Sequence, residues 1–141
     1  MRDSPTAMPA QKQLIVPELD ALTAAVRSAV SLPNYWTGTA HAVAGELRSH
    51  SPSPDILSAE QRTGDPANYR DHLLRAETDG SFSIIAVVWI PGQVTPVHDH
   101  ITWCVSGVIQ GLVYEEPAGC VHEYRSAVRR GSALTSATIW P

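Results

Sequence analysis

Cysteine is scarce in this sequence, and its two cysteines, Cys104 and Cys120, stand too far apart to form a CxxC pair. A disulfide framework or a zinc ribbon requires more cysteines at closer spacing, so the sequence excludes both classes. Basic residues are also few, because ten Lys and Arg stand against fourteen Asp and Glu and give a net charge of -4. Without a basic patch interleaved with aromatic residues, we expect no nucleic-acid partner.

Long hydrophobic runs are absent as well. The longest uninterrupted apolar run, residues 84–90, is far shorter than the roughly 20 residues that a membrane-spanning helix needs. The polar N-terminal segment lacks the apolar stretch of a secretory signal peptide. We therefore expect a cytoplasmic protein without a membrane partner, present as a monomer or a dimer.

What is present divides into an N-terminal helical part and a later β part. Residues 1–16 show no hydrophobic period and are expected to form a flexible terminus. Residues 17–62 carry apolar residues at three- and four-residue steps, which predicts helices. From residue 68 the pattern changes to short apolar segments interrupted by Gly or Pro, which predicts strands. The length suits one domain, which we expect to cover residues 17–141.

The individual elements follow from the same patterns. Helices are expected at residues 17–32, 39–48 and 55–62. Strands are expected at residues 82–90, 98–100, 103–110, 112–115 and 121–125. The tail of residues 132–141 consists mostly of Ser, Ala and Thr, and we expect it to pack loosely. The order of helices followed by strands predicts a mainly β fold, a sandwich or small barrel over residues 68–141.

Two histidines, His98 and His100, stand one residue apart in a segment predicted to be a strand. Because side chains alternate along a strand, both imidazoles would point to one face and Asp99 to the other. Two neutral imidazoles on a rigid strand form a natural first half of a site for Fe, Zn, Cu or Ni. The alternative is a solvated His-Asp-His turn without a metal, because such short motifs also match by chance.

The spacing around this pair belongs to a longer pattern. Five residues separate Gly92 from His98, three separate His100 from Cys104, and six separate Cys104 from Gly111. This pattern resembles the first sequence motif of the cupin superfamily, with cysteine at the position of the usual glutamate. The replacement is similar to thiol dioxygenases of the cysteine dioxygenase type, and the segments WIPGQ, TPVHDH and GDPANYRDHLL resemble bacterial members of that family.

The resemblance implies a jelly-roll-like cupin β-barrel with N-terminal helices and an Fe(II) site held by His98 and His100. Its substrates would be O2 and cysteine, or a similar small thiol acid, which is oxidised to the sulfinate. Such chemistry needs open coordination positions for sulfur and oxygen. Neutral histidine ligands suit it, because they leave the positive charge of the metal to stabilise a thiolate.

The family pattern is incomplete in this sequence. A third histidine ligand and a Ser-His-Tyr group belong to a second motif further along the chain, for which no room is left before Pro141. His122 follows Pro117 and Gly119 in a PxGxxH order, but Gly111 would then serve both motifs, which favours a solvent-facing hairpin histidine. We therefore expect a barrel truncated at its C-terminus. An incomplete barrel would leave an unpaired sheet edge, which invites dimerisation or aggregation.

The residues expected to bind the substrate also differ from the pattern of the family. In cysteine dioxygenases the arginine of a Tyr-x-Arg motif binds the substrate carboxylate, whereas here Tyr69 is followed directly by Arg70, and Asp71 occupies the arginine position. Either Arg70 takes over, or the protein is similar to bacterial 3-mercaptopropionate dioxygenases, which lack that arginine; Arg75 is another basic candidate. Tyr69 and Arg70 are our candidate substrate-binding residues, the alternative being a packed ring and a solvated charge.

Two other functions stay open beside the Fe(II) thiol dioxygenase. One is a catalytically inactive, truncated cupin that acts as a binding or interaction module. The other is a cupin enzyme that uses another metal, such as Zn or Ni. For Trp89, Trp103 and Cys104 we expect a place in the packed interior, with no crosslink to the cysteine.

Overall fold

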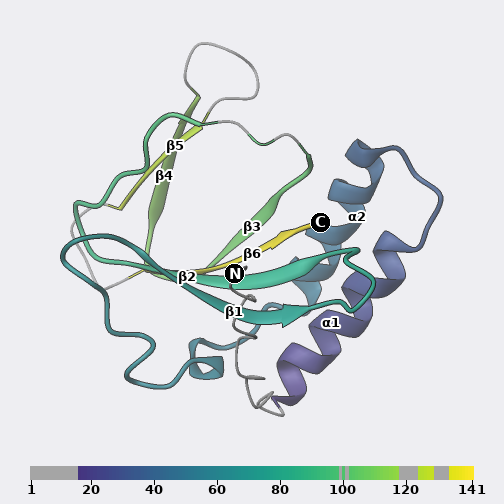
Figure 1. Ribbon diagram of the computed structural model, residues 1–141, viewed down its shortest axis with the longest axis horizontal. Coiled ribbons are helices and arrows are strands. Elements are labelled where there is room, and N and C mark those ends of the chain that lie inside the picture. The colour runs from purple at the N-terminus through teal and green to yellow at the C-terminus, as the bar shows by residue number, and fades with distance from the viewer. Residues whose placement is uncertain (1–15, 99, 101, 118–123, 129–133) are drawn as a thin grey trace, which may run out of the picture.

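The computed structural model describes residues 16–98, 100, 102–117, 124–128 and 134–141 (Figure 1). Within them, the helices are α1 (Pro17–Val30), α2 (Trp36–Ser49) and the 3-10 helix η1 (Pro54–Ile56). The strands are β1 (Arg70–Ala76), β2 (Ser83–Trp89), β3 (Val105–Gln110), β4 (Val113–Pro117), β5 (Tyr124–Val128) and β6 (Leu134–Trp140). The flexible terminus expected at residues 1–16 lies outside the described residues except for residue 16.

Both long helices begin close to the positions that the sequence predicts. In α1, Pro17 occupies the first turn, where a missing N–H costs nothing, and Glu18 and Asp20 lie near the positive end of the helix dipole. The helix predicted from residue 17 is therefore confirmed. α2 begins at Trp36, three residues before the predicted start, and the helix expected at residues 55–62 shortens to η1 and turns. No helix in the described part of the chain is both long and apolar enough to cross a membrane.

The strands form an open sheet instead of a barrel. Four of them pair antiparallel in the order β1-β2-β6-β3, and β4 and β5 form a separate two-stranded sheet. A barrel closes only when its first and last strands pair, but within the described residues β1 and β3 each have a partner on one side alone. The expected mainly β cupin barrel is therefore wrong, and the structure is a mixed α and β fold with an open sheet.

The C-terminal tail forms the strand that holds this sheet together. β6 lies between β2 and β3, with Ile139 opposite Ile84 on one side and Val105 on the other. Ile139 is completely buried, so the expectation of a loosely packed tail is wrong. Main-chain groups provide the pairing on both sides of a central strand, so pairing does not require a long apolar run.

The hydrophobic core lies between the helices and one face of the sheet (Figure 1). Leu22, Val26 and Val43 come from the helices, and Ile84 and Ile139 face them from the sheet, all with no exposed surface. Burial of each such side chain contributes about 1.5–3 kcal/mol. Trp89 and Trp103 are also buried, as predicted.

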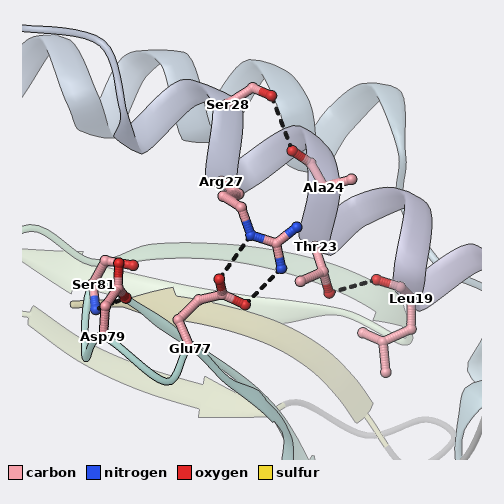
Figure 2. A network of polar contacts seen from close by, with 8 residues as sticks. All are labelled: Leu19, Thr23, Ala24, Arg27, Ser28, Glu77, Asp79 and Ser81. Atoms are coloured by element: carbon pink, nitrogen blue, oxygen red, sulfur yellow. Dashed lines mark hydrogen bonds and ion pairs between the residues drawn. The ribbon is translucent and has the colours of Figure 1, made fainter.

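Two ion pairs attach α1 to β1 and to the turn that follows β1. Figure 2 shows the Arg27 guanidinium bound to the Glu77 carboxylate, with Nε 2.7 Å from Oε2 and Nη2 2.9 Å from Oε1. Arg75 Nη2 donates to Asp20 Oδ1 at 2.6 Å, and its Nη1 donates to the Leu74 carbonyl at 2.9 Å. The helix is thereby positioned on the sheet by paired charges as well as by apolar contact.

Candidate functional site

The candidate site lies in the segment that connects β2 to β3. A turn follows β2 directly, and the Gln93 N–H donates to the Ile90 carbonyl at 3.2 Å. Within this turn Gly92 adopts φ of +94°, which side chains disfavour. The Gln93 side chain accepts from the Ile90 N–H at 2.9 Å and donates to the Asp65 carbonyl at 2.7 Å. Hydrogen bonds thus hold the turn at the start of the segment in shape and attach it to the loop before β1.

The two histidines of the segment lie next to each other. Their ring centroids are 5.2 Å apart and the rings meet edge to face at 70°. His98 Nδ1 lies 2.8 Å from the Pro96 carbonyl oxygen. Because a carbonyl oxygen only accepts, Nδ1 carries the proton, and Nε2 keeps the lone pair that a metal would use. Both side chains are exposed, so ligands from solvent reach them.

A loop, and not the predicted strand, brings the rings together. His98 forms a single β-bridge, and the described residues between β2 and β3 contain no continuous strand. The expected strand at residues 98–100 is therefore wrong, and Asp99 lies outside the described residues. The two rings are close because of the loop conformation. The alternation of side chains along a strand, on which the prediction was based, does not apply here.

The two rings are close enough for both to reach one metal ion. Their centroids are 5.2 Å apart, and bonds from a metal ion to imidazole nitrogens are about 2.1 Å long. Among the described residues, no group of three His, Cys, Asp or Glu side chains is arranged to hold a metal. His122, the candidate third ligand, lies outside the described residues. Cys104, half-buried just before β3, is not part of such a group.

The two candidate substrate-binding residues lie in different surroundings. The Tyr69 ring stacks on Trp89 at a centroid distance of 4.6 Å and an interplanar angle of 28°. Arg70 pairs across β1 and β2 with Val88, and its Nη2 lies 3.6 Å from Asp65 Oδ2. Neither of these contacts includes His98 or His100. Arg70 nevertheless keeps 42% of its side chain exposed, so its charge is accessible to a solute.

Asp71 points to the opposite face of β1 from Arg70, because neighbouring strand residues alternate. Although Asp71 is exposed, nearby protein atoms remove part of the hydration of its carboxylate and raise its pKa, while His72 acts against this rise. Arg75, the other basic candidate, is only 8% exposed and is bound to Asp20 of α1. The structure thus turns Arg75 toward the helix and leaves Arg70 as the accessible cation of β1.

Sequence reasoning missed the residues that connect the two loops. Asp65 accepts from the Gln93 side chain through its carbonyl, contacts Arg70 through its carboxylate, and accepts from the Ala67 N–H at 2.8 Å. Gln93 was part of the WIPGQ segment and Asp65 part of the GDPANYR segment, but no spacing rule joins residues so far apart.

A comparison of the chain with models of known protein families finds no match.

Proposed function

We propose that this protein is an Fe(II)-dependent thiol dioxygenase that oxidises cysteine or a similar small thiol acid to its sulfinate. The observation that carries the proposal is the pair of exposed imidazoles, His98 and His100, at a centroid distance of 5.2 Å. The resemblance of the segment from Gly92 to Gly111 to thiol dioxygenases, with Cys104 at the position of the usual glutamate, favours iron and a thiol over other metals and substrates. In this reaction both atoms of O2 end on the sulfur, so the electrons lost by sulfur equal those gained by oxygen.

The residues of this chain would act by binding and orienting. His98 is held in the tautomer that offers Nε2 by its hydrogen bond to the Pro96 carbonyl. Bound Fe(II) would supply a positive charge that favours the thiolate over the thiol and a place for O2. Arg70 is our candidate for the substrate carboxylate, since it is exposed and Asp65 only partly offsets its charge at 3.6 Å.

We place the reaction in the cytoplasm, with a small thiol and O2 as the only partners it requires. The support is the scarcity of cysteine, because a secreted domain of this size more often carries a disulfide framework. The exposure of both histidines supports direct access for small solutes.

Iron binding tests the site directly. The His98→Ala/His100→Ala double variant should lose at least about ten times in Fe(II) affinity, because both imidazole ligands are removed. Iron content after anaerobic loading with Fe(II) and desalting is the measurement. His41→Ala is the matched control, since His41 is exposed on α2 and should retain wild-type iron content. Wild-type iron content in the double variant would contradict the assignment of His98 and His100 as iron ligands.

Turnover tests the chemistry separately. The iron-loaded wild-type protein should consume O2 with cysteine or with 3-mercaptopropionate and form the sulfinate, which mass spectrometry detects as the thiol plus two oxygen atoms. Protein loaded with Zn or Ni should not. Iron binding by the histidine pair without sulfinate from either thiol would contradict the dioxygenase and support a binding module, whereas activity with Ni or Zn alone would support another metal enzyme.

A further inference from the structure

The four-stranded sheet has a second face, which points away from α1 and α2. Across β1 and β2, Asp71 pairs with Val87 and Leu73 pairs with Ile85, and directly paired residues share one face. Ile84, the neighbour of Ile85, points the other way, into the core beneath the helices. We call the surface formed by Asp71, Leu73, Ile85 and Val87 the outer face. Its apolar side chains are not fully covered, because Leu73 is 53% exposed and Ile85 and Val87 are half-buried.

Aromatic rings bound one end of the outer face. Trp89 follows Val87 on the same face of β2, and Tyr69, Val87 and Val113 pack against it. Val113 belongs to β4, which Figure 1 shows on the side of the sheet away from the helices. Protein atoms therefore shield part of the outer face from water.

Asp71 is the one charged residue that strand pairing places on this face of the four-stranded sheet within the described residues. Within the same residues its carboxylate forms no hydrogen bond or ion pair, whereas the carboxylates of Asp20, Asp65 and Glu77 each contact an arginine. Loss of hydration raises the pKa of Asp71, so folding disfavours its anion. A cation taken from solution would stabilise that anion.

We propose that the outer face binds a primary amine with an apolar tail, the ammonium group on the Asp71 carboxylate and the tail on the apolar side chains. An ammonium group donates charge-assisted hydrogen bonds to a carboxylate, and these are about twice as strong as neutral ones. Neighbouring strands lie about 4.8 Å apart, so a chain of about six carbons extends from β1 across β2. Burial of this hydrocarbon against the outer face adds to the affinity. The inference does not rest on the proposed thiol chemistry.

Other classes of ligand fit the outer face less well. An anion would be repelled by Asp71 and by the net charge of -4. A neutral apolar molecule would remove further water from the carboxylate without giving it a partner. A calcium or magnesium ion needs several oxygen ligands, whereas the outer face offers one carboxylate within the described residues. Arg70 points to the opposite face and Arg75 is bound to Asp20, so neither arginine neutralises Asp71.

The test is a titration of the full chain with hexylammonium chloride at neutral pH, followed by NMR. The methyl signals of Leu73, Ile85 and Val87 should shift in a saturable way. Asp71→Asn should raise the dissociation constant by about ten times or more, because the charge-assisted hydrogen bond is lost. Glu60→Gln is the matched control, since it removes the same charge from an exposed position in the turn after η1, and it should leave the constant unchanged.

Two further ligands separate the contributions of the charge and the tail in the wild-type chain. Ethylammonium has the charge but a short tail, and 1-hexanol has the tail but no charge, so each should bind more weakly than hexylammonium. Equal binding of 1-hexanol and hexylammonium, an equal effect of the two variants, or saturable shifts confined to other parts of the protein would overturn the proposal. If Asp71→Asn fails to fold by circular dichroism, the comparison of the three ligands on the wild type decides.

Discussion

At the scale of single residues, two carboxylates respond to folding in opposite directions. The hydrogen bonds from Arg27 hold the pKa of Glu77 below its ordinary value. Loss of hydration raises the pKa of Asp71 above its ordinary value, against the smaller effect of His72. The first carboxylate is more stable as an anion in the folded chain than in the unfolded chain, and the second is less stable.

These shifts predict effects of opposite sign on stability. A carboxylate with a lowered folded pKa stabilises the fold above its unfolded pKa of about 4.3, and this contribution is lost as the pH falls through the folded pKa. Glu77→Gln should therefore lower the free energy of unfolding near pH 7. Asp71→Asn should raise it, because the variant no longer carries an anion that folding disfavours. Urea unfolding of the wild type and both variants from about pH 7 to about pH 3 measures this.

Both differences should shrink toward acidic pH, where the wild-type carboxylates are protonated. The two variants serve as controls for each other, since each removes one carboxylate charge, Asp71 from β1 and Glu77 from the turn that follows it. Effects of the same sign for both at neutral pH would show that net charge, and not the local surroundings, controls the response.

At the scale of elements, a side chain helps to position the segment between β2 and β3, whose described residues form only single β-bridges at Val94 and His98. Gln93 joins this segment to the loop before β1 through its hydrogen bond to the Asp65 carbonyl. The same loop contains the carboxylate that faces Arg70. One glutamine therefore connects the histidine segment to the segment with the candidate substrate-binding cation.

Gln93→Ala should weaken iron binding several-fold and lower the free energy of unfolding by about 1–2 kcal/mol, because two hydrogen bonds are lost. Iron titration and urea unfolding are the measurements. Gln61→Ala is the control, since the Gln61 side chain accepts from the Ser58 N–H in a different turn. Gln61→Ala should lower the free energy of unfolding by a similar amount for each hydrogen bond lost but leave the iron affinity unchanged. Equal losses of iron affinity in both variants would mean that Gln93 has no specific role in positioning.

At the scale of the whole molecule, β6 decides whether the sheet is one unit. It is the shared partner of β2 and β3, so contacts between the two parts of the sheet pass through it. Ile139 of β6 is buried together with the apolar side chains of α1 and α2. The hydrophobic core therefore contains side chains from both ends of the described chain, from α1 and α2 and from β6.

Ile139→Ala should lower the free energy of unfolding by about 2–5 kcal/mol, because the truncation leaves a cavity in a closely packed core. Urea unfolding monitored by tryptophan fluorescence measures the loss. Leu112→Ala removes the same type of side chain from a position that is 72% exposed and should change stability by no more than about 0.5 kcal/mol. A loosely held C-terminal tail would make both substitutions equally mild.

Prediction from the sequence succeeded where the signal was local. The three- and four-residue steps from Leu19 to Val26 predicted α1, and the Ile- and Val-rich run predicted β2. It failed at β6, because Ser, Ala and Thr carry little hydrophobic signal and its pairing partners lie far away along the chain. For the candidate site, the residue types and their spacing were visible, but the loop geometry of His98 and the contact of Gln93 with Asp65 were not.

The sequence by itself determined that α1 and β2 form where their hydrophobic patterns lie, which side chains can bind a metal, and that His98 and His100 stand one residue apart. Those properties depend on neighbouring residues and on the chemistry of each side chain. Only the tertiary structure decided that the sheet is open, that the tail lies at its centre, and that Arg75 faces α1 while Arg70 stays accessible. The reason is that strand order and ion pairing join residues far apart in the chain, and their free energy depends on contacts that no local pattern contains.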